Sequence, residues 1–313
     1  MPKIANATCI ALLSLASATG ARAAPTIENL KNPNIGKMSA EEMTDAEPMP
    51  LPAITQEEHD EMKRRFRELN PAIPDQRPLP GDRGAIATPG ILEKIAAPDV
   101  SAPYWSAGRL SFRDDTGKAR WCSAQYVDDL KVILTAAHCV INHASGVWHS
   151  DFSFARASVD GDSPQTIDWR CISIFDAYHR PSVNYAYDYA FILARSDDER
   201  PPLELASGIP ASTDLTAIGY PSTPDRGRYL YKVDGSWLGV AGGIVTMADN
   251  PLTAGSSGGA WFADFEAGGS GGKNRVVSLN SHRLTNDTQT LGPLFTNDTL
   301  ALKNHVRDAR CLD

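Results

Sequence analysis

The stretch LTAAHCV at residues 134–140 places a histidine, His138, directly after an apolar run of strand-forming residues and before a cysteine. The pattern calls for another buried aliphatic residue there, because a buried imidazole needs hydrogen-bond partners. His138 is either a satisfied core histidine beside a structural cysteine or a group that takes part in chemistry. The residues that decide between these interpretations lie elsewhere in the chain.

A serine inside a glycine-rich turn follows in the stretch TAGSSGGAWF at residues 253–262. A serine hydroxyl is a weak nucleophile at neutral pH unless a base takes its proton, so a reactive Ser257 needs a histidine partner. Glycines let backbone N–H groups converge on a developing oxyanion, which makes the N–H groups of Gly255 and Ser257 the expected donors. The alternative is a plain Gly/Ser loop, such as the one at residues 266–274, but Ser257 directly precedes an apolar strand.

An aspartate begins the otherwise apolar stretch DYAFILA at residues 188–194. A carboxylate that enters a core must be hydrogen-bonded or paired. A histidine N–H would satisfy Asp188 and would fix the tautomer in which the other ring nitrogen accepts a proton. A strand-end cap is the alternative for Asp188 alone, but the order His138, Asp188, Ser257 favours a shared role.

Together, the motifs TAAHC, DYAFILA and GSSGGAW resemble those of the trypsin/chymotrypsin-like serine proteases, in particular the short secreted bacterial members, over about residues 105–310. The resemblance implies that His138 is the general base and acid, that Asp188 orients it and that Ser257 is the acyl-forming nucleophile. It also implies a protein or peptide substrate and two antiparallel β-barrels with the site in the cleft between them.

The strand pattern after residue 104 supports that fold independently. Twelve short runs of alternating apolar residues follow, a number typical of barrels or sandwiches. A polar link that contains prolines, residues 195–210, divides them into two groups of six. We therefore expect an all-β protease domain at residues 104–313. It should contain two six-stranded antiparallel barrels, at about residues 104–195 and 210–297, and end in a helix at about residues 298–309.

Residues 1–23 have the pattern of a secretory signal peptide, with Lys3, an apolar stretch and then ARA before the expected cleavage point. The apolar stretch is too short to span a bilayer, and no other run reaches the roughly 18–20 apolar residues that spanning needs. We therefore expect a secreted or periplasmic protein with no membrane segment.

Loss of the signal removes Cys9 and leaves four cysteines, for which an oxidising compartment favours disulfides in one of three pairings. Their spacing does not fit a zinc site, so we expect no metal. The family resemblance implies a bridge between Cys139 and Cys122, which would hold the loop of the histidine, and leaves Cys171 for Cys311.

The composition excludes other classes of function. The 313 residues are 42% hydrophobic and 22% charged, with a net charge of −8 and no stripe of Lys and Arg, so we expect no nucleic-acid partner. No phosphate loop, dinucleotide fingerprint or calcium loop occurs, so we expect no cofactor.

Residues 24–103 differ in character, since twelve of the 22 prolines fall there among acidic runs. Such a stretch cannot build a core of its own and is expected to be of low order. One helix is predicted at residues 55–69, where Thr55 and Glu58 form a capping box. The region is either a disordered spacer or the pro-segment of a zymogen that covers the rest of the chain or helps it to fold.

Two departures from the family bear on activation and specificity. Ser256 replaces the aspartate that receives a new N-terminus in many members, so we expect a largely preformed pocket. Pro251 stands where trypsin-like members carry an aspartate. Asn280 and Ser281 are expected near the pocket, with His282 and Arg283 at its rim. These last two residues either favour acidic substrates, as in glutamyl endopeptidases, or form a solvated strand end.

Two other interpretations of the motif around Ser257 remain open. The residues GSSGG also fit the G-x-S-x-G pattern of α/β-hydrolases, but no amphipathic helices alternate with the strands. The second alternative is a protease-like fold that acts as a non-catalytic binding module. Labelling of Ser257 by a serine-directed probe would distinguish an enzyme from such a module. We read the remaining histidines as surface residues: His59, His143, His149 and His179.

Overall fold

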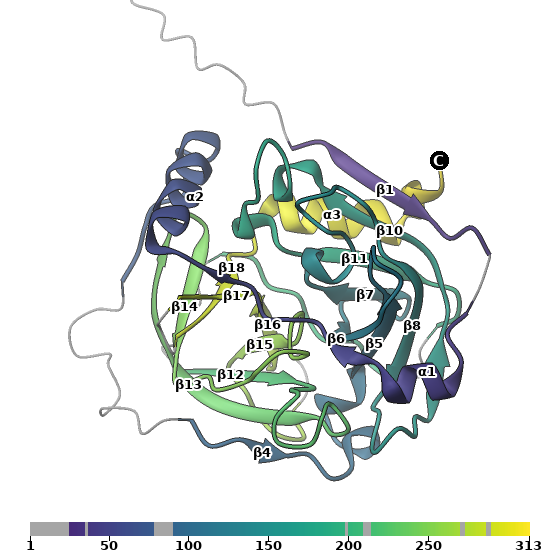
Figure 1. Ribbon diagram of the computed structural model, residues 1–313. Helices are drawn as coiled ribbons and strands as arrows, with labels where there is room; N and C mark the ends of the chain where they lie inside the picture. The colour runs from purple at the N-terminus through teal and green to yellow at the C-terminus, as the bar shows by residue number, and fades with distance from the viewer. Residues whose placement is uncertain are drawn as a thin grey trace, which may run out of the picture.

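The computed structural model describes residues 25–34, 37–77, 90–197, 200–208, 214–269, 273–285 and 289–313. The predicted signal peptide, residues 1–23, lies outside these ranges. Two curled antiparallel sheets make up most of the described chain, with one longer helix against the first sheet and one beside the second (Figure 1). This confirms the predicted all-β, two-unit architecture.

The first sheet contains nine strands in the order β1-β10-β11-β7-β6-β5-β8-β9, and β2 pairs with β6. Seven of these strands come from the predicted first barrel: β5 (Ala107–Arg113), β6 (Ala119–Tyr126), β7 (Val132–Thr135), β8 (Ser150–Arg156), β9 (Gln165–Ile167), β10 (Trp169–Phe175) and β11 (Ala190–Ala194). The sequence predicts six, because β9 is only three residues long and merges with the β10 pattern.

The second sheet also contains nine strands, in the order β16-β15-β12-β13-β14-β18-β17-β3, and β4 pairs with β13. Seven come from the predicted second barrel: β12 (Asp214–Gly219), β13 (Tyr231–Ala241), β14 (Ile244–Ala248), β15 (Ala260–Ala263), β16 (Arg275–Leu279), β17 (His282–Leu284) and β18 (Thr290–Pro293). The sequence predicts six here as well, since the three residues of β17 show no clear alternation.

The C-terminal helix α3 (Asn297–Arg307) confirms the predicted helix and packs on β10 and β11 of the first sheet. Thr296 caps its first turn. Behind it, Cys311 forms a disulfide with Cys171 of β10. The second disulfide joins Cys122 of β6 to Cys139. Both pairings are those that the family resemblance implies.

The N-terminal region is more ordered than the sequence predicts. It contains β1 (Ile27–Lys31), α1 (Ala40–Asp45), β2 (Glu47–Pro48), β3 (Ala53–Ile54), α2 (Gln56–Leu69) and β4 (Glu93–Lys94). The expectation of low order fails because each short strand pairs with a strand of the two sheets and needs no core of its own.

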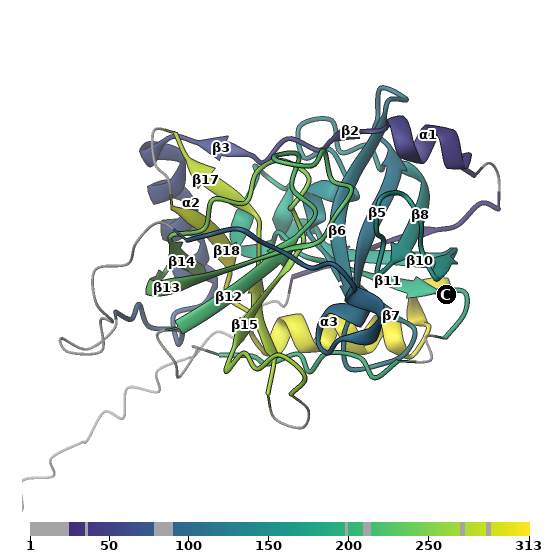
Figure 2. The same cartoon turned by 90° about the horizontal axis from the view of Figure 1, so that it is seen from below.

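This region crosses from one sheet to the other. In both views the chain leaves α1 beside the first sheet, continues through β2 and β3, and reaches α2 beside the second sheet (Figures 1 and 2). The predicted capping box of α2 is present, with Thr55 and Glu58 bonded to each other's backbone. None of the helices in the described ranges combines the length and apolar character that crossing a bilayer requires.

Candidate active site

His138 and Asp188 meet between the two sheets as the sequence predicts. His138 lies in a short 3₁₀ helix, Ala137–Cys139, that follows β7, and the Cys122–Cys139 disulfide ties this turn to β6. Asp188 precedes β11, which pairs with β7. The His138 ring Nδ1 lies 2.8 Å from Asp188 Oδ2, and the His138 backbone N–H donates to Oδ1 at 2.9 Å. The carboxylate therefore fixes both the ring and the backbone of the histidine.

Asp188 is completely buried and has a third hydrogen-bond donor, the hydroxyl of Ser281, at 2.5 Å from Oδ2. Burial on its own would raise the pKa of this carboxyl. The charge of His138 and the hydrogen bonds from His138 and Ser281 outweigh that effect and lower the pKa of Asp188. Asp188 therefore remains an ionised acceptor inside the protein.

The hydrogen bonds continue from Ser281 to His282, whose Nδ1 lies 2.9 Å from the serine oxygen. Because the hydroxyl proton is donated to Asp188, that oxygen accepts from His282 Nδ1–H. His282 is fully buried and stacks on Tyr185 with 4.5 Å between ring centroids. Burial lowers the pKa of His282 to about 3, so the ring is neutral at pH 7. It does not lie at the pocket rim, where the sequence places it.

Ser257 lies beside the histidine turn. Its carbonyl accepts a hydrogen bond from the N–H of Ser123 in β6 at 2.8 Å and lies 3.9 Å from the sulfur of Cys139, the neighbour of His138. The Ser257 Oγ and His138 Nε2 atoms are both buried without a hydrogen-bond partner in the part of the chain described. The predicted bond between them is not formed, and in free enzymes such bonds are often long and tighten only with substrate.

The loop that contains Ser257 depends on Asn280, which the sequence places near the pocket. The Asn280 Nδ2 donates to the carbonyls of Ile218 and Ser256, and Oδ1 accepts from Trp261 Nε1 and Asn250 Nδ2. The side chain is buried, and this amide is occupied by the protein itself. Asn280 therefore positions the loop before Ser257 without the ion pair that an aspartate at position 256 would make.

Arg283 lies against the segment that contains Pro251. Its Nη2 donates to the carbonyls of Asn250 at 2.9 Å and Leu252 at 2.6 Å, on either side of the proline. Burial lowers the pKa of Arg283. No carboxylate pairs with this guanidinium within the described ranges, and its Nε is buried without a partner.

The N-terminal region contacts the loop that contains Ser257. We call residues 47–54, which include β2 and β3, the strap. The carbonyl of Met49 accepts a hydrogen bond of 3.0 Å from the N–H of Gly255, the predicted oxyanion donor. The N–H of Met49 donates to the carbonyl of Trp121 at 2.9 Å, and the N–H of Arg283 donates to the carbonyl of Pro52 at 2.8 Å. The sequence gives no signal for these contacts.

Three of the histidines read as surface residues are buried: His59, His149 and His179. His59 belongs to α2, and its ring centroid lies 6.2 Å from that of His282. Burial, with a smaller effect of Lys63, lowers the pKa of His59 to about 4. Its burial follows from the seating of α2, whose buried face it shares with Met62 and Phe66 at helical spacing.

One group of potential metal ligands was found in the described chain, formed by Cys122, His138 and Cys139, whose ligand atoms lie within 4.8 Å of one another. The two sulfurs are bonded to each other in a disulfide. No thiolate is left there to bind a metal, so the arrangement fits a structural bridge beside the histidine.

Comparisons with known proteins identify the fold. No protein-family model and no curated protein matches the chain by sequence. The serine protease AL20 from an extremophilic microorganism is 24% identical over 64% of this chain and 96% of its own, with a TM-score of 0.55. Protease Anisep from Arthrobacter nicotinovorans is 20% identical over 68% and 98%, with a TM-score of 0.56. A Glu endopeptidase is 20% identical over 71% and 99%, with a TM-score of 0.61.

These likenesses show that the chain has the chymotrypsin-like serine protease fold, as its motifs predict. Each match spans nearly all of the solved protein but at most 71% of this chain. The chain therefore carries substantial structure in addition to what it shares with them.

Proposed function

We propose that the protein is a secreted serine endopeptidase that hydrolyses peptide bonds through an acyl-enzyme. Ser257 is the nucleophile, His138 the general base and acid, and Asp188 the group that orients His138. The N–H groups of Gly255 and Ser257 form the oxyanion hole. The observation that carries the proposal is the pair of hydrogen bonds from His138 to the buried Asp188, next to a glycine-rich loop whose Ser257 hydroxyl has no hydrogen-bond partner among the described residues.

The geometry favours the proton transfers that this reaction needs. Asp188 accepts from His138 Nδ1–H, so Nε2 is the ring nitrogen with a lone pair. It takes the proton of Ser257 as Oγ bonds to the substrate carbonyl carbon, and the oxyanion that forms is bound by backbone N–H groups. The protonated ring then gives its proton to the leaving amine nitrogen. Water then attacks the acyl-enzyme carbonyl as His138 takes its proton, and the carboxylic acid half of the substrate is released as Ser257 regains its proton.

We also propose that residues 24–103 are a pro-segment and that the full chain is an inactive precursor. The carbonyl of Met49 already uses the N–H of Gly255, which an oxyanion would need. His138 and Ser257 are buried while the strap is in place. A substrate cannot reach them without displacing it.

The experiment is active-site labelling of the secreted protein after its N-terminus has been mapped by mass spectrometry. A sulfonyl fluoride should modify Ser257 in the processed form, which should also hydrolyse a peptide library. The Ser257→Ala variant is the control and should show neither reaction. A processed protein that is folded yet neither labelled nor active would refute the proposal and favour a non-catalytic binding module.

A further inference from the structure

We infer that the strap is a built-in inhibitor that lies in the cleft with a chain direction opposite to that of a substrate, and that it therefore escapes cleavage. This inference rests on the proposed function, since it concerns the same cleft. The inference goes beyond the proposal that the pro-segment blocks the cleft. A strap in substrate direction would also block the cleft, but only until its peptide bond was hydrolysed.

The direction of a substrate follows from the proposed site. In the proposed site His138 must protonate the leaving nitrogen, and its turn is tied to β6 by the Cys122–Cys139 disulfide, so the leaving half of a substrate lies on the β6 side of Ser257. The acyl half then lies on the other side, along β17, where Arg283 contacts the segment that contains Pro251. A substrate therefore runs from β17 to β6.

The strap runs from β6 to β17. Its first residues, Glu47 and Pro48, pair in parallel with Arg120 and Trp121 of β6. Its last residues, Ala53 and Ile54, pair in parallel with Arg283 and Leu284 of β17. A chain in substrate direction would lie antiparallel to β17, so the parallel pairing is the signature of reversal.

Reversal explains why the strap resists hydrolysis. The carbonyl of Met49 sits at the Gly255 donor, but the nitrogen bonded to that carbonyl belongs to Pro50, on the β17 side. A substrate's leaving nitrogen would lie on the β6 side, where His138 can protonate it. In the strap no amide nitrogen bonded to the Met49 carbonyl lies on that side, so His138 has no leaving group to protonate. Prolines at positions 48, 50 and 52 fix the backbone torsions and favour an extended chain, which hinders rearrangement into a cleavable register.

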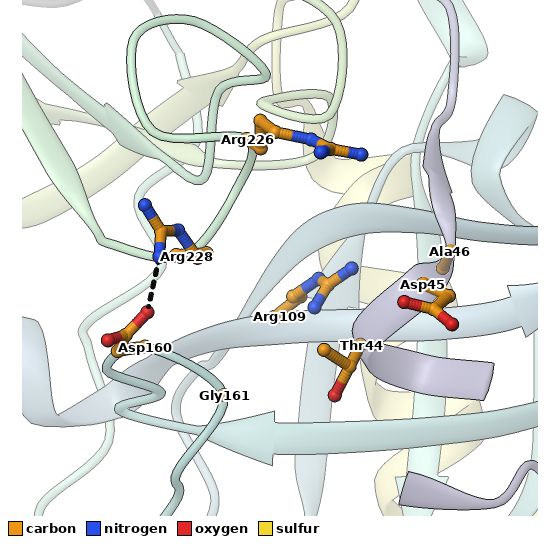
Figure 3. A pocket seen from close by; sticks show the side chains of 8 residues that line it. All are labelled: Thr44, Asp45, Ala46, Arg109, Asp160, Gly161, Arg226 and Arg228. Carbon is orange, nitrogen blue, oxygen red and sulfur yellow. Dashed lines mark hydrogen bonds and ion pairs between the residues drawn. The ribbon is translucent and has the colours of Figure 1, made fainter. Parts of the chain in front are cut away.

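Opposite charges hold the first end of the strap. Residues 40–48 contain four acidic residues and no basic one. Glu42 pairs with Arg113, and Glu47 pairs with Arg120 at 2.7 Å. Beside them α1 forms one wall of a cavity whose other walls include three arginines, Arg109, Arg226 and Arg228 (Figure 3).

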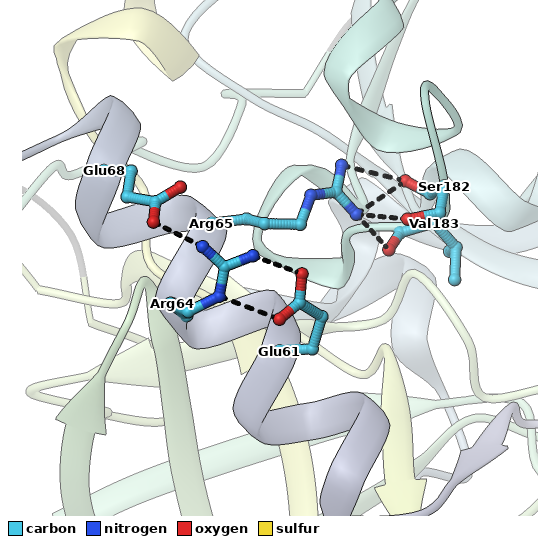
Figure 4. A network of polar contacts seen from close by, with 6 residues as sticks. All are labelled: Glu61, Arg64, Arg65, Glu68, Ser182 and Val183. Atoms are coloured by element: carbon cyan, nitrogen blue, oxygen red, sulfur yellow. Dashed lines mark hydrogen bonds and ion pairs between the residues drawn. The ribbon is translucent and has the colours of Figure 1, made fainter.

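The helix α2 holds the second end. Its buried face sits on the 3₁₀ helix Tyr185–Tyr187 directly before Asp188: Met62 Sδ accepts from the N–H of Tyr185 at 3.2 Å, and the rings of Phe66 and Tyr187 are 5.8 Å apart. On the outer face Arg65 donates to the carbonyl of Ser182 at 3.2 Å (Figure 4). The strap is therefore stretched between two anchored helices.

The test of direction is disulfide trapping in the full-length Ser257→Ala protein, in which no self-cleavage occurs. Two cysteine pairs match the parallel register: Ala53→Cys with Arg283→Cys, and Glu47→Cys with Arg120→Cys. Two swapped pairs, Ala53→Cys with Arg120→Cys and Glu47→Cys with Arg283→Cys, match a strap in substrate direction. Mass spectrometry of unreduced peptides should find the matched bridges in most molecules and the swapped ones in fewer than about a tenth. Swapped bridges, or none of the four, would overturn the inference.

The test of inhibition is the labelling rate of Ser257 by a sulfonyl fluoride in the full-length protein. Phe66→Ala loosens α2 and should raise the rate at least tenfold, whereas Glu57→Ala, on the exposed face of the same helix, should leave it unchanged. Arg65→Ala serves as a second loosening variant that removes no buried side chain. Unchanged rates in both loosened variants would contradict inhibition by the strap. If the processed protein is not labelled at all, the proposed function fails, while the trapping result still reports the direction of the strap.

Discussion

The hydroxyl of Ser281 donates a hydrogen bond of 2.5 Å to Asp188, on the same carboxylate oxygen that His138 Nδ1 contacts. Hydrogen bonds to a charged group contribute about 1.5–3 kcal/mol. Ser281 thus positions the carboxylate that orients His138. It lies between β16 and β17 of the second sheet, whereas His138 follows β7 and Asp188 precedes β11 of the first sheet. The bond joins the two halves of the fold at the candidate active site.

Replacement of Ser281 by alanine should lower kcat/KM of the processed protein by about 10- to 100-fold, because Asp188 loses one of its donors. Ser281→Thr keeps a hydroxyl and should restore most of the activity, which a role in packing alone would not predict. The measurement is hydrolysis of a fluorogenic peptide, with the unfolding midpoint of each variant recorded in parallel. Equal activity of the alanine variant and the parent would contradict a positioning role.

Substitution of Gly255 should abolish most of the activity. Its φ is +85°, a conformation that side chains disfavour, and a Cβ atom there would overlap the Trp121 ring and approach the Tyr220 carbonyl. Gly255→Ala should therefore displace the proposed oxyanion donor and lower kcat by roughly 10²–10³-fold. Gly117→Ala is the matched control, since Gly117 has φ +83° and no neighbouring atom within 4 Å of the added Cβ. It should keep full activity.

Acid should weaken the full-length protein through its buried histidines. Burial lowers the pKa of His59 to about 4, with Lys63 lowering and Asp60 raising it, and His282 faces the same ring. The unfolded chain binds a proton near pH 6.5, so stability present at pH 7 is lost as the pH falls toward 4. Between pH 7 and pH 5 the loss is roughly 2 kcal/mol for His59.

Urea unfolding of the full-length protein at pH 7 and pH 5 measures this loss. His59→Gln should reduce the difference between the two pH values, because glutamine does not titrate. Carboxylates also respond in this range, so the comparison of variant and parent is what isolates the histidine. An identical pH dependence of the two proteins would show that His59 carries no such linkage.

If the proposed function holds, the processed protein should prefer acidic side chains on the acyl side of the cut. Arg283 donates to two carbonyls that flank Pro251 and has no carboxylate partner within the described ranges, so a substrate carboxylate would supply its missing counter-charge. A peptide library should show cleavage after Glu or Asp, and Arg283→Gln should lose most of that preference. Strict cleavage after Lys or Arg would contradict the prediction.

Local signals in the sequence were sufficient for the two-sheet architecture and for the meeting of His138 with Asp188. In each motif a polar residue stands next to an apolar strand, where its burial is costly unless it has a hydrogen-bond partner. The pattern therefore predicts that these polar residues contact one another. The α2 helix was predictable for a similar reason, because its capping box lies within four consecutive residues. The disulfide pairing came from the family resemblance and not from spacing.

The strap and the contacts of Ser281 were not predictable in this way. The residues PMPLP show no strand alternation, and their partners are backbone groups far away in the sequence. Ser281 resembles a pocket residue until the fold brings Asp188 to it. His59 had a usable signal, since His59, Met62 and Phe66 repeat at helical spacing and form the buried face of α2.

The N-terminal strands also close the sheets at their ends. β1 is the terminal strand of the first sheet beside β10, and β3 is the terminal strand of the second beside β17. If maturation removes them, β10 and β17 each become an edge with an unpaired row of N–H and C=O groups. The edge at β17 is the one that an extended substrate would fill. The edge at β10 stays vacant, and it is where two mature molecules would be most prone to join edge to edge.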